Sequence, residues 1–265
     1  MRKLYITLVA LSLLIWACSK EETTPPSAPQ NLKGTAVDDG ENLKLTWDAP
    51  TQGTPDRYEI RCDGSTIDPD LPDTTTTYTI IGTQNVCRQV QVVAVKGSYE
   101  SAATLDLTPA QNTVRVYRSD VPDKPSWAKV VFGANISVSA IFTGDVNCDV
   151  ANTGYFIYAI PNTLKDVSET INPDCQAKYE FAFSSQATTE NLAPSTGNYN
   201  TVRDISDGAT YFYWADNTSV GYKQIDANDY FGKVVVSIGS DNYGYYADLT
   251  IYTQNKVQGL RWVKQ

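Results

Sequence analysis

Two short aromatic runs in the second half of the chain have the residue types that bind ligands, Tyr211–Trp214 and Tyr243–Tyr246. Tyrosine and tryptophan rings offer a flat apolar face with a polar group at one edge. Sugars can stack their apolar C–H faces on such rings. We therefore predict a carbohydrate-binding platform made of Trp214, Tyr211, Tyr213, Tyr243 and Tyr245. The alternative is that these rings pack the core or stiffen strands.

Oxygen-bearing side chains alternate in the segment from Asp145 to Asp149. Calcium prefers clustered oxygen ligands, so Asp145, Asn147 and Asp149 are candidate ligands. Val150 stands at the sixth position, where an EF-hand has glycine, so any such site has another geometry. The alternative is a solvated hairpin loop. We predict no cofactor other than this possible calcium ion.

The chain contains no histidine, which excludes Ser-His-Asp and Cys-His catalysis and His-ligated metal sites. Paired carboxylates can hydrolyse glycosides without histidine. Asp226 with Asp229, or Asp145 with Asp149, are candidate pairs, but no surrounding motif distinguishes them. We therefore predict a non-enzymatic protein with no catalytic residue. The net charge of −9 also argues against a nucleic-acid partner.

The N-terminus has the pattern of a signal peptide. Arg2 and Lys3 precede a stretch from Leu4 to Ala17 that is apolar apart from Thr7 and Ser12. This stretch is short for a transmembrane helix and matches the apolar region of an export signal. Residues 1–17 are thus predicted to be removed.

The end of this stretch, Ile15-Trp16-Ala17-Cys18, resembles a bacterial lipobox. The resemblance implies that Cys18 is lipidated and that the lipid membrane is one partner. The next four residues, 19–22, resemble the surface-export signal of Bacteroidota lipoproteins, which implies the outer face of the outer membrane. The alternative is an ordinary secretory signal with a chance cysteine. Residues 18–28 are polar and proline-rich and are predicted to form a tether.

Residues 29–109 resemble a fibronectin type III domain, which implies a β-sandwich. The resemblance is carried by the segments Pro29–Leu32, Leu43–Pro50, Tyr58–Ile60, Thr77–Ile80 and Val90–Val95. The residue pattern agrees independently, because Leu43, Leu45 and Trp47 alternate as in a half-buried strand.

Four cysteines remain when Cys18 is set aside, an even number that favours two disulfides in an exported protein. Three connectivities are possible. We favour Cys62–Cys87 and Cys148–Cys175, because each pair then lies within one predicted domain.

Residues 113–265 are predicted to form a larger β-sandwich or jelly roll, so the whole chain is all-β. The expected strands are Val114–Arg118, Ala128–Phe132, Ile136–Thr143, Gly154–Ile160, Lys178–Ser184, Thr210–Trp214, Gly221–Ile225, Lys233–Ile238, Tyr245–Tyr252 and Gln258–Val263. One short helix is expected at Leu164–Ile171, and Asp241 with Asn242 is expected to supply the turn of a hairpin whose tip carries Tyr243–Tyr246. The polar segment 184–209 is either a functional loop or a loop that contains a short strand.

These observations predict a surface-exposed lipoprotein that binds a glycan through its C-terminal domain and is not an enzyme. One alternative is an adhesin or structural subunit of a cell-surface assembly, which would bind a surface protein. Another is a carboxylate glycoside hydrolase. A concave row of exposed rings would favour glycan binding, and a flat patch of rings would favour a protein partner. Two carboxylates about 5 to 9.5 Å apart across a cleft would favour the hydrolase.

Overall fold

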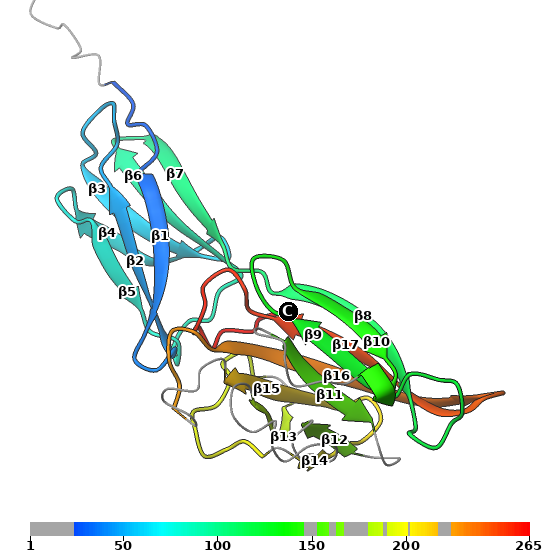
Figure 1. Ribbon diagram of the computed structural model, residues 1–265. Coiled ribbons are helices and arrows are strands. Elements are labelled where there is room, and N and C mark those ends of the chain that lie inside the picture. Colours follow the sequence, from blue (N-terminus) through cyan, green and yellow to red (C-terminus); the bar gives the residue numbers. More distant parts are fainter. Residues whose placement is uncertain are drawn as a thin grey trace, which may run out of the picture.

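The protein folds into two antiparallel β-sandwiches, which Figure 1 shows one after the other along the long axis of the molecule. The computed structural model describes residues 24–145, 153–158, 163–166, 180–187, 190–200, 202–216 and 224–265. These residues form strands β1 to β17 and one 3-10 turn, Thr143–Asp145. The predicted all-β class is confirmed.

The N-terminal sandwich packs a sheet of three strands on a sheet of four. The first sheet has the order β1 (Gln30–Val37), β2 (Asn42–Asp48), β5 (Thr77–Ile80), and the second β4 (Ser65–Pro72), β3 (Arg57–Cys62), β6 (Gln89–Lys96), β7 (Tyr99–Asp106). Leu43, Leu45 and Trp47 on β2 are buried while the residues between them are exposed. Side chains alternate between the two faces of a strand, so this observation confirms the predicted period of two.

The C-terminal sandwich packs two sheets of five strands. The first has the order β10 (Ser137–Ile141), β9 (Trp127–Val131), β11 (Thr153–Tyr158), β12 (Thr163–Asp166), β14 (Val202–Asp204). The second has the order β13 (Glu180–Ala187), β15 (Thr210–Asp216), β16 (Tyr230–Asp241), β17 (Gly244–Thr253), β8 (Ala110–Tyr117). Val130 and Leu164 from the first sheet and Val234 and Leu249 from the second are fully buried in one core.

Three local predictions are wrong. The described start of the helix expected at Leu164–Ile171 belongs to strand β12, because its backbone pairs with β11 and β14; residues 167–171 lie outside the described residues. The strand expected at Gln258–Val263 is an irregular segment with one isolated bridge, Leu192 to Trp262. The strand expected at Gly221–Ile225 is absent at its described end, Gln224 and Ile225, and residues 221–223 lie outside the described residues. The long polar segment does contain a short strand, β14.

The end of the predicted tether is part of the N-terminal sandwich. Pro26 and Pro29 are buried, and the Ser27 amide donates to the Gln52 carbonyl oxygen over 2.8 Å. The chain is therefore fixed to the sandwich earlier than residue 28, which corrects the predicted length of the tether. Cys18 and the signal peptide lie outside the described residues.

After β17 the chain returns to the N-terminal sandwich and enters its core. Val257, Leu260 and Trp262 pack there with Leu43 and Ile60. We call residues 257–264 the C-terminal clamp. Apolar residues of the clamp thus complete a core that is formed mostly by residues more than a hundred positions earlier in the sequence.

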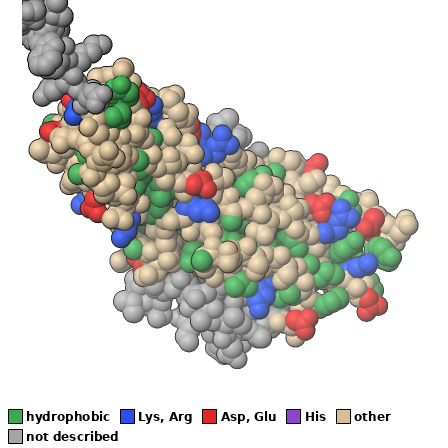
Figure 2. Space-filling view, turned by 90° about the horizontal axis from the view of Figure 1, so that it is seen from above, with side chains coloured by type: hydrophobic (Ala, Val, Ile, Leu, Met, Phe, Trp, Pro, Cys, Tyr) green, Lys and Arg blue, Asp and Glu red, His purple; other side chains and the backbone are tan. Residues whose placement is uncertain are grey.

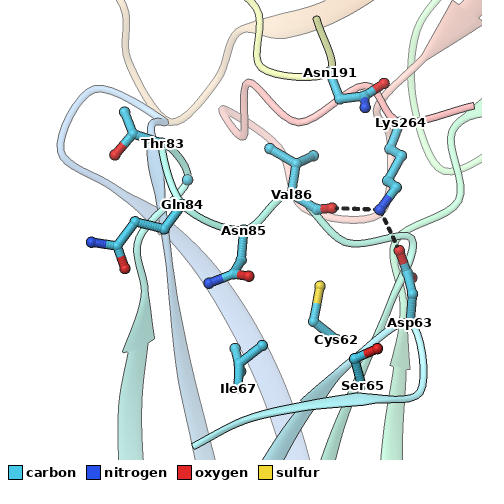
Figure 3. Close-up of a pocket in the computed structure, with 11 residues that line it drawn as sticks. Cys62, Asp63, Ser65, Ile67, Thr83, Gln84, Asn85, Val86, Asn191 and Lys264 are labelled. Atoms are coloured by element: carbon cyan, nitrogen blue, oxygen red, sulfur yellow. Dashed lines mark hydrogen bonds and ion pairs between the residues drawn. The ribbon is translucent and has the colours of Figure 1, made fainter.

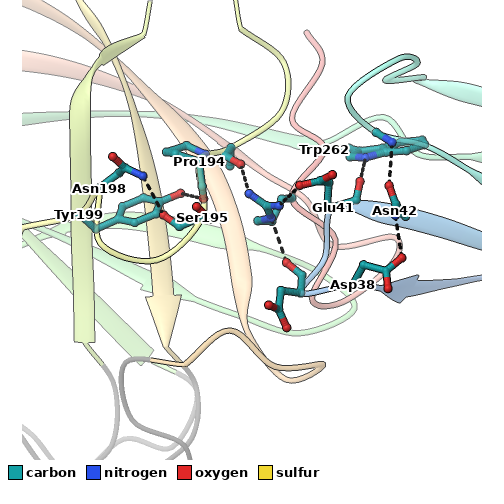
Figure 4. A network of polar contacts seen from close by, with 12 residues as sticks. Asp38, Glu41, Asn42, Pro194, Ser195, Asn198, Tyr199 and Trp262 are labelled. Carbon is teal, nitrogen blue, oxygen red and sulfur yellow. Dashed lines mark hydrogen bonds and ion pairs between the residues drawn. The ribbon is translucent and has the colours of Figure 1, made fainter.

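Polar contacts hold the C-terminal clamp in place (Figure 4). The Arg261 side chain is 4% exposed and its guanidinium donates to the carbonyl oxygens of Asp39 and Ala193 over 2.9 and 2.7 Å. The same group pairs with the Glu41 carboxylate at 3.0 Å. One side chain therefore links the β1–β2 turn to a loop of the C-terminal sandwich.

We expect Arg261→Met to lower the free energy of unfolding by about 1–3 kcal/mol, because the carbonyl oxygen of buried Ala193 loses its donor. Urea denaturation followed by circular dichroism measures the change. Arg88→Met is the matched control, since Arg88 is exposed and its side chain makes no hydrogen bond or ion pair with the described residues. Equal stability of the two variants would contradict the role assigned to Arg261.

Candidate functional site

The β16–β17 hairpin projects at the end of the molecule opposite the start of β1 (Figure 1). Its strands pair from Gly232 with Thr253 to Asp241 with Gly244, which leaves Asn242 and Tyr243 in the turn. The Tyr243 amide donates to the Asp241 carboxylate over 2.9 Å, and Gly244 has a φ of +140°, which favours glycine. The turn predicted at this position is confirmed.

The loop between β8 and β9 packs along the hairpin and supports its tip. The Arg118 amide donates to the Tyr245 carbonyl oxygen over 3.0 Å, and the Tyr117 amide donates to the Pro125 carbonyl oxygen over 2.8 Å. A Cβ at Gly244 would lie 2.9 Å from a methyl group of Val121. The tip is therefore held by a second segment and does not stand alone.

Two tyrosine rings at this tip are exposed to solvent, Tyr243 by 64% and Tyr245 by 53%. The Lys124 ammonium lies 3.5 Å from the centre of the Tyr243 ring, and the Arg118 guanidinium lies 5.7 Å from that of Tyr245. Both distances are within the range of cation–π attraction. We call these four residues the distal tyrosine patch. Figure 2 shows hydrophobic side chains interleaved with acidic and basic ones at this end.

Charged groups beneath the patch fix the strands that carry it. Arg115 forms two hydrogen bonds of 2.8 Å with the Asp248 carboxylate, a strong bidentate geometry, and lies 3.7 Å from the centre of the Tyr246 ring. Tyr117 donates to the Asp241 carboxylate over 2.9 Å. This carboxylate raises the pKa of Tyr117, which therefore stays protonated and keeps donating. Arg118 pairs with Asp120, whereas Lys124 has no acidic partner among the described residues.

Three members of the predicted platform are core residues, which corrects that part of the prediction. Tyr211, Tyr213 and Trp214 are exposed by 2%, 0% and 5%. They lie on β15, an interior strand whose two faces are both covered. Tyr211 and Tyr213 face the core between the sheets, and Trp214 packs with Ala193 and Val263 on the other side. A strand buried on both faces is apolar throughout, so its rings are unavailable to a ligand.

The acidic candidates do not form a catalytic pair in the described structure. Asp229 is fully buried and accepts hydrogen bonds from the Trp214 indole at 3.0 Å and the Asp226 amide at 2.9 Å. Asp229 therefore cannot reach a substrate. Asp145 is exposed at the end of the 3-10 turn. Its partners in the predicted calcium and carboxylate sites, Asn147 and Asp149, lie outside the described residues.

Among the residues that the structure describes, no group of three metal-binding side chains comes together. In the same residues, no helix has the length and apolar character needed to cross a membrane. The Cys62–Cys87 disulfide is present, with the two Cα atoms 5.4 Å apart, which confirms the first predicted pair. The other pair, Cys148 and Cys175, falls outside the described residues.

Sequence reasoning found Tyr243 and Tyr245 but missed the cations beside them. Lys124 is more than a hundred residues from Tyr243 in the chain, and no local pattern links the two. Comparison with known proteins adds no family to this description: no family model matches the sequence, and no curated protein matches it significantly.

Proposed function

We propose that this protein is a non-catalytic binding protein displayed at the outer face of the outer membrane on a lipid at Cys18, and that it binds a protein partner through the distal tyrosine patch. The observation that carries the proposal is the exposure of Tyr243 and Tyr245 at a projecting tip, each beside a cation. Tyrosine and arginine are enriched among the residues that dominate protein–protein binding energy.

The geometry favours a protein over a glycan at this patch. Three of the five predicted platform rings are buried, and a cation lies over one face of each remaining ring. Sugar stacking needs a free ring face, whereas a protein partner can use ring edges, hydroxyl groups and the charges around them. The patch is also the tip of a hairpin and not a concave row.

The arrangement of the two sandwiches supports display at a surface. The first described residues enter the N-terminal sandwich at one end of the molecule and the patch lies at the other (Figure 1). A lipid at Cys18 would thus place the patch far from the membrane. The three-plus-four strand arrangement is compatible with a fibronectin type III-like arm, and we propose that the N-terminal sandwich acts as this arm.

The test measures binding of the mature full chain to immobilised surface extracts of the cells that produce it. We expect Tyr243→Ala combined with Tyr245→Ala to weaken binding by about 30-fold, the effect of losing a binding hot spot. Tyr99→Ala is the matched control, because Tyr99 is 48% exposed but lies in the N-terminal sandwich.

Treatment of the extract identifies the class of partner. Protease treatment should abolish the binding that depends on Tyr243, and periodate, which cleaves sugar diols, should leave it intact. The opposite result would favour the second candidate, a glycan, which the solvent exposure of Tyr243 and Tyr245 also supports. Unchanged binding by the double variant would rule out the patch for either partner.

A further inference from the structure

A hollow of about 460 Å³ lies where the N-terminal sandwich meets the C-terminal clamp. Its size falls within the range of small-ligand sites, about 300–1,000 Å³, and such sites are common at domain junctions. The N-terminal sandwich contributes Ser65 from the β3–β4 hairpin and Gln84 and Asn85 from the β5–β6 loop. The C-terminal part of the chain contributes Asn191 and Lys264, which Figure 3 shows above the hollow.

The walls of the hollow are fixed before any ligand arrives. The Cys62–Cys87 disulfide joins the end of β3 to the segment before β6. The Asp63 carboxylate accepts hydrogen bonds of 2.9 Å from the amides of Arg88 and Gln89. A preformed site loses little conformational entropy when it binds.

The charges at the hollow neutralise each other. The Lys264 ammonium lies 2.7 Å from the Asp63 carboxylate and donates to the Val86 carbonyl oxygen over 3.0 Å. Burial raises the pKa of Asp63, but Lys264 and the two backbone amides outweigh it and hold the pKa below its ordinary value. The Asp63 carboxylate therefore stays ionised near neutral pH and balances the Lys264 ammonium beside it, so the pair adds no net charge to the hollow.

Several polar side chains at the hollow are free to bind a ligand. The amides of Gln84 and Asn85 and the hydroxyls of Ser65 and Thr83 make no hydrogen bond among the described residues. An amide both donates and accepts, as does a hydroxyl, so together they match a molecule rich in hydroxyl groups. The half-buried Ile67 side chain, drawn below Asn85 in Figure 3, adds an apolar surface.

We propose that this hollow binds a neutral saccharide of one or two units. The uncharged amides and hydroxyls would bond the sugar hydroxyls, and Ile67 would contact a C–H face of the ring. The site is separate from the distal tyrosine patch and does not rest on the function proposed for that patch.

The experiment follows the amide signals of the mature full chain by NMR during titration with glucose, galactose, mannose, N-acetylglucosamine, maltose and lactose. Glucuronic acid and inorganic phosphate are the charged comparisons. We expect at least one neutral sugar to shift the side-chain amide signals of Gln84 and Asn85. Absence of a shift with every neutral sugar, or a stronger response to a charged probe, would overturn the proposal.

Two variants test the site independently. Asn85→Ala should weaken binding about tenfold, the effect of about 1.4 kcal/mol, and Ser65→Trp should abolish it by filling the hollow. Gln111→Ala, which removes an exposed amide from β8, and Tyr243→Ala are controls that should bind the sugar as the wild type does. Unchanged sugar binding by both Asn85→Ala and Ser65→Trp would overturn the hollow as the site, whatever the distal tyrosine patch binds.

Discussion

Trp262→Ala is expected to lower the free energy of unfolding by about 3–5 kcal/mol, the usual cost of truncating a buried tryptophan. Trp262 is fully buried in the core of the N-terminal sandwich. Its indole nitrogen donates to the Glu41 carbonyl oxygen over 2.7 Å. The substitution therefore leaves both a cavity and a partly buried acceptor without its donor.

The close approach of Trp262 depends on a glycine opposite it. A Cβ at Gly82 would lie 2.6 Å from the indole nitrogen and 2.0 Å from the Glu41 carbonyl oxygen. The Gly82 amide also donates to the Asn42 side chain over 3.0 Å. The indole thus fits a space shaped by the β1–β2 turn and the segment after β5. Because both are fixed by hydrogen bonds, we expect them to move little into the cavity that Trp262→Ala would leave.

Urea denaturation followed by circular dichroism measures this effect, since loss of a tryptophan alters fluorescence directly. Trp262→Phe should cost less than Trp262→Ala, because a ring remains to fill most of the space. Tyr99→Ala is the surface control and should stay within about 0.5 kcal/mol of the wild type. A loss below about 1 kcal/mol for Trp262→Ala would mean that the C-terminal clamp does not stabilise the N-terminal sandwich.

Replacement of Cys62 and Cys87 by serine is expected to cost about 3 kcal/mol. The two cysteines are 25 residues apart, and a cross-link over this length restricts the unfolded chain by about that amount. The pair also lies in the N-terminal core, where Cys62 is 9% and Cys87 1% exposed, so the serines would bury hydroxyl groups in place of sulfur.

The measurement compares urea midpoints of the wild type and of the Cys62→Ser/Cys87→Ser variant, both kept oxidised. Peptide mapping of the unreduced protein checks the pairing itself. A peptide that joins Cys62 to Cys148 or Cys175 would contradict the connectivity. Equal midpoints would contradict the stabilisation assigned to the Cys62–Cys87 cross-link.

Local patterns predicted the parts of the fold that depend on neighbouring residues. The alternation of Leu43, Leu45 and Trp47 predicts a strand with one buried face, and β2 has it. The turn before Tyr243 was predicted from Asp241 and Asn242, and the structure has its hairpin there. These features follow from the period of a strand and the preferences of turn residues, which act over a few positions.

The aromatic run on β15 could not be interpreted from the sequence alone. Both a half-buried strand with a binding face and a strand covered on both sides contain such rings. Only the position of β15 between β13 and β16, with the C-terminal clamp over its second face, places Trp214 in the core. Strand order in a sheet is a long-range property that the run itself does not encode.

The sequence by itself therefore predicted the all-β class, favoured the Cys62–Cys87 pair among three connectivities, and singled out Tyr243 and Tyr245 without deciding whether they are exposed. The tertiary structure alone decided that Lys124 lies over Tyr243 and that Trp262 completes the N-terminal core. It also decided that Leu164 belongs to a strand, since pairing with two neighbours outweighs a weak local helix preference. The physical reason is the same in each case: the deciding contacts join residues that are distant in the chain.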